Sequence, residues 1–85
     1  MEYEFTIIVP VYNEEENLLR VEKQLANYLT IGSKKSCILF VNDGSKDNSL
    51  ALIKDICERQ MAFHYISFES NQGLSAAIKA GFDYA

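Results

Sequence analysis

This sequence lacks several features that would assign a small protein to a class directly. Acidic residues outnumber basic ones by twelve to eight, giving a formal net charge of −4, and no basic patch of the kind that binds nucleic acid is present. No apolar stretch approaches the roughly 18–20 residues needed to cross a bilayer. The acidic start MEYEF is unlike a signal peptide. These absences argue against a nucleic-acid partner and predict a cytoplasmic protein.

Residues that bind metals or take part in redox chemistry are also scarce. Cys37 and Cys57 are the only cysteines, and their spacing matches no zinc motif. They are either a redox pair or half a metal site, or two reduced thiols in a core, and we expect the second. His64 has no acidic or cysteine neighbour arranged for metal or triad chemistry, so we expect it to be structural. The sequence also lacks the GxGxxG and P-loop signatures, which argues against dinucleotide-binding proteins and kinases.

What the sequence does contain is a regular alternation of two hydrophobic patterns. Apolar runs predict strands at residues 5–9, 37–41 and 63–68. Helical spacing of apolar residues predicts helices over about 15–30, 47–59 and 74–85. A βαβαβα order implies an α/β domain with a parallel sheet, in which all the strand-to-helix turns emerge at one edge.

The first strand and the turn after it carry three specific expectations. The continuous apolar run at 5–9 predicts a strand buried on both faces. Pro10 has no N–H, so we expect the chain to leave the sheet there. Asn13 is a suitable N-cap, and Glu14 and its two acidic successors would then favour the positive end of the helix dipole.

Candidate binding groups follow the strands, where ligands of open α/β sheets bind. Tyr12 either stacks on a planar base or packs at the sheet edge. Asp43 either accepts hydrogen bonds from a nucleobase or ribose, or forms an Asx-turn or cap. Asn71 and Gly73 either present backbone N–H groups to a phosphate or form a turn with a positive-φ glycine. Lys79 either reaches a phosphate or is solvated.

Three segments together resemble one known family. They are PVYNEEENL at 10–18, VNDGSKDNS at 41–49 and NQGLSAAIKAGFDYA at 71–85, and they resemble the family 2 glycosyltransferases with a GT-A fold. The sequences of these segments most resemble the branch of dolichyl- and polyprenyl-phosphate sugar transferases. The resemblance implies the N-terminal part of a GT-A fold, a Rossmann-like three-layer βαβαβα fragment with sheet order 3-2-1.

The resemblance also implies an activity and a set of binding residues. The family transfers a sugar from a nucleotide-diphosphate sugar to an acceptor by direct displacement, and the acceptor here would be polyprenyl phosphate or a glycan. The residues expected to bind the nucleotide sugar are Pro10, Tyr12, Glu14, Val41, Asp43, Asn71 and Lys79.

The family's catalytic motifs are not in this sequence. In the family a fourth strand follows, with an Asp-x-Asp motif that holds Mg²⁺ or Mn²⁺ against the diphosphate, and a further carboxylate acts as base. We therefore expect residues 1–85 to be a single incomplete domain that binds the donor and is inactive alone, with no catalytic residue or metal ligand. Mg or Mn and any membrane contact, at the cytoplasmic face, would belong to the full-length enzyme.

The missing fourth strand has a second implication. In the family it pairs with the first strand, so without it the edge of the 5–9 strand is open. We expect the chain to self-associate through this edge.

Two other classes of protein remain as alternatives. The first is a noncatalytic Rossmann-like binding or interaction module, such as a flavodoxin-like or receiver domain. A receiver needs a phosphorylatable Asp after its third strand, where this chain has Ser70-Asn71-Gln72-Gly73. The second is a nucleotidyltransferase, whose usual Gly-rich basic loop is absent here.

Overall fold

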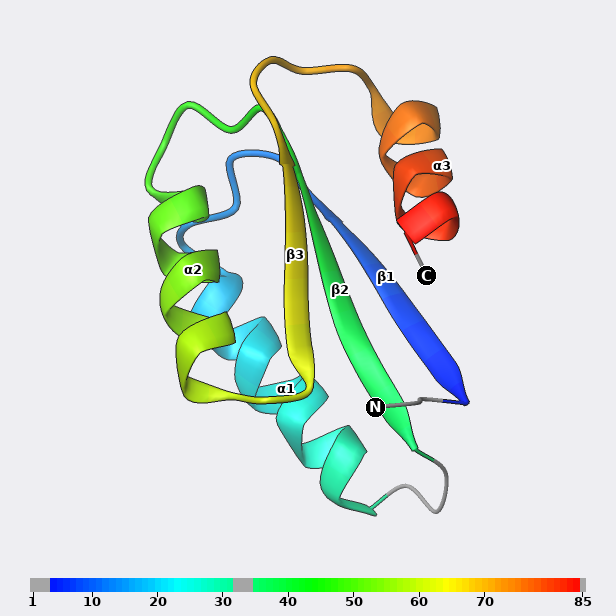
Figure 1. Ribbon diagram of the computed structural model, residues 1–85. Helices are drawn as coiled ribbons and strands as arrows, with labels where there is room; N and C mark the ends of the chain where they lie inside the picture. The colour runs from blue at the N-terminus through cyan, green and yellow to red at the C-terminus, as the bar shows by residue number, and fades with distance from the viewer. Residues whose placement is uncertain (1–3, 32–34, 85) are drawn as a thin grey trace.

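The computed structural model describes residues 4–31 and 35–84. In these residues strands and helices alternate along the chain, as the sequence predicts. The elements are β1 (Phe5–Val11), α1 (Leu18–Ile31), β2 (Ser36–Asp43), α2 (Ser49–Arg59), β3 (Phe63–Phe68) and α3 (Leu74–Tyr84). The strands form one parallel sheet in the order β1-β2-β3 (Figure 1). The α/β class, the βαβαβα order and the 3-2-1 sheet order are thus confirmed.

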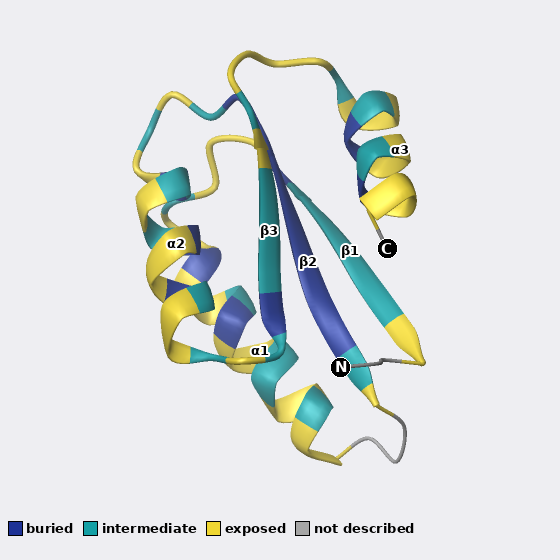
Figure 2. Cartoon of the chain, viewed as in Figure 1, coloured by how far each residue is buried: buried dark blue, intermediate teal, exposed yellow. Residues whose placement is uncertain are grey.

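The helices cover both faces of the sheet and make a three-layer structure. Helices α1 and α2 lie side by side on one face, and α3 lies on the other, against β1 and β2 (Figure 1). Side chains alternate across β2, because successive residues of a strand point to opposite faces. Ile38 and Phe40 pack in the core under α1 and α2, whereas Leu39 and Val41 pack under α3. The central strand is accordingly the most buried element (Figure 2).

Strand β1 differs from its prediction in two ways. It is partly exposed instead of buried on both faces, with Phe5 53% exposed, because β1 is an edge strand of the sheet. It also continues past Pro10, which pairs with Val41. The Phe5 N–H points to β2, where it donates to the Lys35 carbonyl at 3.2 Å. The backbone N–H groups of successive strand residues point alternately toward β2 and away from it. The nitrogen of Pro10 therefore faces the open edge, and no hydrogen bond of the sheet is lost.

The expected cap of α1 is also wrong. The helix begins at Leu18 and has no acidic residue in its first turn, so Asn13 is not its N-cap. The carbonyl of Glu14 instead accepts N–H groups from Asn17 at 2.9 Å and Leu18 at 3.1 Å. The acidic run therefore lies in the turn before the helix, where its residues form other hydrogen bonds.

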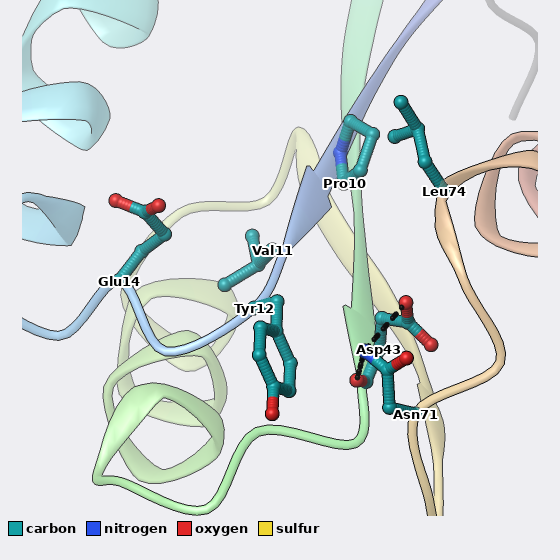
Figure 3. Close-up of a pocket in the computed structure, with 7 residues that line it drawn as sticks. All are labelled: Pro10, Val11, Tyr12, Glu14, Asp43, Asn71 and Leu74. Carbon is teal, nitrogen blue, oxygen red and sulfur yellow. Dashed lines mark hydrogen bonds between the residues drawn. The ribbon is translucent and has the colours of Figure 1, made fainter.

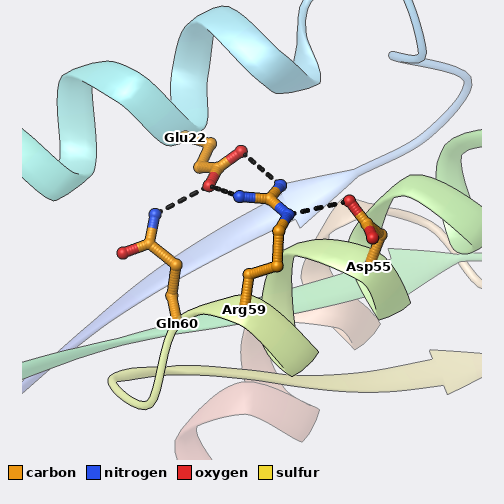
Figure 4. Close-up of polar contacts among 4 residues, drawn as sticks. All are labelled: Glu22, Asp55, Arg59 and Gln60. Carbon is orange, nitrogen blue, oxygen red and sulfur yellow. Dashed lines mark hydrogen bonds and ion pairs between the residues drawn. The ribbon is translucent and has the colours of Figure 1, made fainter.

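A buried carboxylate joins α1 to α2, and the hydrophobic pattern of the sequence does not predict it. Glu22 is only 7% exposed, and its two oxygens accept both terminal nitrogens of Arg59 at 2.8 and 3.0 Å (Figure 4). Gln60 donates a third hydrogen bond at 2.7 Å, and Asp55 holds the other side of Arg59. The hydrogen bonds from Arg59 lower the pKa of Glu22 despite its burial, so it stays ionised.

Both cysteines are free thiols. Cys37 is buried in β2, and burial raises the pKa of the Cys57 thiol to about 11.

Across 4–31 and 35–84, no helix combines the length and hydrophobicity required to traverse a membrane.

Candidate functional site

A pocket of about 410 Å³ opens at the C-terminal ends of β1 and β2. This is the edge at which ligands of open α/β sheets bind. Residues from the end of β1, the end of β2 and the start of α3 converge on it (Figure 3). The lining residues are Pro10, Val11, Tyr12, Glu14, Asp43, Asn71 and Leu74.

Asp43 is the most constrained group of the pocket. It is 4% exposed, and its Oδ1 accepts the backbone N–H of Gln72 at 2.6 Å. Its Oδ2 accepts the Gly73 N–H at 3.0 Å and the Asn71 side-chain amide at 3.1 Å. The carboxylate therefore caps the loop that leads into α3, rather than a turn of its own.

Gly44 brings the end of β2 directly against this same loop. A Cβ at position 44 would overlap the backbone of Ser70 and Asn71, and the φ of Gly44 is +67°. Both the close approach and the positive φ require glycine. The pair Asp43-Gly44 therefore holds the β3–α3 loop by a carboxylate and by backbone contact.

Tyr12 and Glu14 lie on the other side of the pocket. Tyr12 is 43% exposed, so much of its ring is free to meet a ligand. The Glu14 side chain points away from Asp43 (Figure 3) and accepts the Asn17 amide at 3.2 Å. Of the two, the tyrosine has the better geometry for contact with a planar group.

Between Tyr12 and Glu14, Asn13 ties the turn after β1 to the turn after β2. Its N–H donates to the Ser45 hydroxyl at 3.0 Å, and its side-chain oxygen accepts the Lys46 N–H at 2.8 Å. Asn13 has a φ of 52°, a conformation that asparagine tolerates better than most residues. This reciprocal pair fixes the direction in which Tyr12 and Glu14 leave the sheet.

Further hydrogen bonds extend the connection between the two turns. The Glu14 N–H donates to the Ser49 hydroxyl at 2.9 Å, and the Glu15 N–H donates to Asp47 at 3.2 Å. In return, the Asn48 N–H donates to the Glu15 carboxylate at 3.2 Å. Desolvation opposes the charge of Asp47, but hydrogen bonds from Ser49 and Glu15 outweigh it and lower the Asp47 pKa.

The structure brings together most, but not all, of the residues expected from the sequence. Pro10, Tyr12, Glu14, Asp43 and Asn71 line the pocket. Val41 is fully buried under α3. Lys79 pairs with Asp83 at 2.9 Å on the outer side of α3. Neither Val41 nor Lys79 lines this pocket.

Two groups of residues were not anticipated. Val11 and Leu74 line the pocket. The sequence alone could place them there only if the boundaries of β1 and α3 were known. Asn13, Ser45 and Asp47 join the two turns. Short polar residues at strand ends are typical of such a connection, but they do not identify the residues that make it.

The described residues do not provide a metal site. Among them no three histidine, cysteine, aspartate or glutamate side chains lie close enough together to hold an ion. The two carboxylates of the pocket also diverge, with Asp43 hydrogen-bonded to the loop and Glu14 pointing away. The described residues by themselves therefore do not fit a Mg²⁺ or Mn²⁺ ion.

Comparison with known proteins finds one family. Residues 6–85 match the family model described as "Glycosyl transferase family 2". An uncharacterised glycosyltransferase of Synechocystis is 36% identical over 85 residues, which are all of this chain and 27% of that protein. A prophage bactoprenol glucosyl transferase homologue of Escherichia coli is 34% identical over 80 residues, 94% of this chain and 26% of that protein.

A eukaryotic relative and a solved structure extend this result. A dolichyl-phosphate beta-glucosyltransferase of Trichomonas vaginalis is 35% identical over 81 residues, 89% of this chain and 25% of that protein. A Pyrobaculum calidifontis mannosyltransferase, solved with GDP-Man and Mn²⁺, superposes with a TM-score of 0.79 at 20% identity, covering 100% of this chain and 25% of that one. This structural likeness shows the fold, that of the N-terminal part of a GT-A glycosyltransferase. The chain spans about a quarter of the length of these proteins.

Proposed function

Because the chain belongs to glycosyl transferase family 2, we propose that its pocket binds the nucleotide of a nucleotide-diphosphate sugar. One observation carries the proposal: the turns after β1, β2 and β3 converge on a single pocket that contains a ring, a carboxylate and a helix start. A base, a ribose and a diphosphate need these three kinds of group. The location at the C-terminal edge of a parallel sheet supports it.

Each part of the pocket has a distinct role in this proposal. The exposed ring of Tyr12 stacks on the base. A carboxylate has about four acceptor positions, and three of those on Asp43 are filled by Asn71, Gln72 and Gly73. The remaining position accepts one N–H of the base or one ribose hydroxyl. The start of α3 at Leu74, with its partial positive charge, favours the phosphates.

The activity of the longer protein is proposed on the same basis. The relatives named for bactoprenol and dolichyl phosphate support a polyprenyl phosphate acceptor, or else a glycan, and direct displacement with inversion at the sugar. The base that activates the acceptor, and the ligands of Mg or Mn, would come from residues outside this chain. Residues 1–85 would therefore be the incomplete, donor-binding part of a domain and inactive alone, and the whole enzyme would work at the cytoplasmic face of a membrane.

The test is calorimetric titration of UDP, GDP and their sugars into the protein. Tyr12→Ala removes the proposed stacking surface, and Tyr28→Ala is the matched control, since Tyr28 is a 52% exposed tyrosine on α1 that does not line the pocket. We expect binding by wild type and Tyr28→Ala and a roughly tenfold loss in Tyr12→Ala, because stacking on one base contributes about 1–3 kcal/mol. If no nucleotide binds, or if both variants bind as wild type does, the proposed pocket is wrong.

A further inference from the structure

The position of the Tyr12 ring is set by the backbone on either side of it. The side chain is 43% exposed, and within the described ranges of the chain it makes no hydrogen bond or ring contact. On one side of Tyr12, Val11 is fixed in the sheet by its pairing with Asn42. On the other side the chain passes directly into Asn13. The conformation of Asn13 therefore decides where the ring stands in the pocket.

Two hydrogen bonds to the turn after β2 hold Asn13 in its conformation. Its N–H donates to the Ser45 hydroxyl at 3.0 Å, and its side-chain oxygen accepts the Lys46 N–H at 2.8 Å. Its φ of 52° lies in the left-handed region, which is unfavourable for residues other than glycine and least so for asparagine and aspartate. The two bonds thus stabilise a backbone that has more favourable alternatives.

The turn that Asn13 binds is itself fixed in place. Ser45 and Lys46 follow directly after Asp43 and Gly44. The Asp43 carboxylate accepts the Gly73 N–H at 3.0 Å, and Gly44 packs against the backbone of the same loop. The bonds of Asn13 therefore connect the Tyr12 side of the pocket to the Asp43 side (Figure 3).

We propose that Asn13 is a positioning residue for nucleotide binding. It holds the Tyr12 ring at a fixed distance from the Asp43 carboxylate, although Asn13 itself does not line the pocket. Two groups that contact one ligand bind it more tightly when their spacing is set before the ligand arrives, because less ordering is left to occur on binding. The inference rests on the proposed nucleotide pocket and adds to it a residue that acts through Tyr12.

A purely structural role for Asn13 is the competing explanation, and other contacts allow the two to be separated. Glu14 and Glu15 make three further hydrogen bonds between the same two turns. These bonds do not involve Asn13, so we expect its variants to fold. Asn13→Gly keeps access to the positive φ but removes the acceptor for Lys46, and Asn13→Asp keeps both. Ser45→Ala removes the other bond and leaves residue 13 unchanged.

The first measurement is ¹⁵N relaxation of the Tyr12 amide without nucleotide. We expect an order parameter of about 0.85 in wild type and Asn13→Asp, and a fall toward about 0.6 in Asn13→Gly and Ser45→Ala. Thr30→Ala is the control, because Thr30 is an exposed residue near the end of α1 whose hydroxyl donates to the Ala26 carbonyl. It should leave the Tyr12 amide unchanged.

The second measurement is calorimetric titration of UDP and GDP under conditions in which urea denaturation shows every variant to be folded. Asn13→Gly and Ser45→Ala should each weaken binding about three- to tenfold, as expected for the loss of one hydrogen bond. Asn13→Asp should bind within about twofold of wild type. In the Tyr12→Ala background Asn13→Gly should cause no further loss, since residues that act through one another are not additive.

The outcomes separate this role from the pocket itself. If wild type binds neither nucleotide, the proposed pocket is wrong and the positioning role fails with it. If wild type binds and both Asn13→Gly and Ser45→Ala bind equally well, the positioning role alone is wrong. An unchanged Tyr12 order parameter in both variants, or a loss in Asn13→Gly that adds in full to that of Tyr12→Ala, would also overturn it.

Discussion

The carboxylate of Asp43 accepts the backbone N–H of Gly73 at 3.0 Å, across the gap between the end of β2 and the start of α3. This contact joins segments thirty residues apart in the sequence. It gives Asp43 a structural role that exists before any ligand is bound. A substitution at this position therefore changes both the loop and the pocket, and the two effects have to be measured separately.

Asp43→Asn should lower the free energy of unfolding by about 1–3 kcal/mol. An amide presents an N–H₂ group where Gly73 and Gln72 now donate to two acceptor oxygens, so at least one of these partly buried N–H groups loses its partner. Urea denaturation measures this change. Asp83→Asn is the control, because Asp83 is exposed and contributes only a surface ion pair with Lys79. Equal stability of the two variants would mean that Asp43 does not hold the loop.

Substitutions of Asn13 should separate backbone conformation from side-chain bonding. Asn13→Asp keeps the acceptor for the Lys46 N–H and tolerates the φ of 52°. Asn13→Gly keeps the conformation but loses the acceptor, and Asn13→Ala loses both. We expect stability in urea to fall in the order Asp, Gly, Ala, with alanine costing about 1–2 kcal/mol more than aspartate. If Ala and Asp are equally stable, the connection between the two turns contributes nothing.

The pH dependence of stability should report the buried carboxylate of Glu22. Hydrogen bonds from Arg59 hold the folded-state pKa below the ordinary value of 4.5. A lowered folded-state pKa means that the contribution is complete above the unfolded pKa and is lost as pH falls through the folded one. Wild type should therefore exceed Glu22→Gln in stability at pH 7, and the difference should shrink below about pH 4.5.

The control for this experiment is Glu58→Gln. Glu58 is an exposed carboxylate of α2, so its substitution should change stability little at any pH. A difference between wild type and Glu22→Gln that stays constant between pH 7 and pH 3 would contradict the account of Glu22.

The Cys57 thiol should be slow to react in the folded protein. With its pKa raised to about 11 by burial, only about one thiol in a thousand is ionised at pH 8, and the thiolate is the reactive form. We expect labelling by a chromogenic disulfide at pH 8 to be at least about tenfold slower in buffer than in urea. Cys57→Ser isolates the contribution of Cys37. Equal rates in the two solvents would show that Cys57 is not shielded.

The sequence predicted the elements well because each carries its own hydrophobic period. It was wrong at Pro10 and at Asn13, where the outcome depends on partners distant in sequence. Whether a proline interrupts a strand depends on which side its nitrogen faces, and this follows from the pairing with β2. The turn at Asn13 is held by Ser45 and Lys46, so local capping preferences did not decide where α1 begins.

The candidate site shows the same division. Tyr12, Asp43 and Asn71 were expected near one another, because parallel strands end at a common edge, and they do line one pocket. The sequence could not indicate that Val41 points into the core or that Lys79 pairs with Asp83. Those outcomes depend on the side of β2 that α3 covers and on the direction in which α3 presents its lysine.

Chemical-shift mapping with UDP and GDP tests the central claim most directly. If the three strand-end turns form one nucleotide site, the amides of Tyr12, Gly44 and Gly73 should shift together with a single dissociation constant. The amide of Tyr28, in α1, and the amide of Phe63, at the opposite end of the sheet, should not shift. Shifts confined to one turn, shifts with different dissociation constants, or no shifts at millimolar nucleotide would contradict the account.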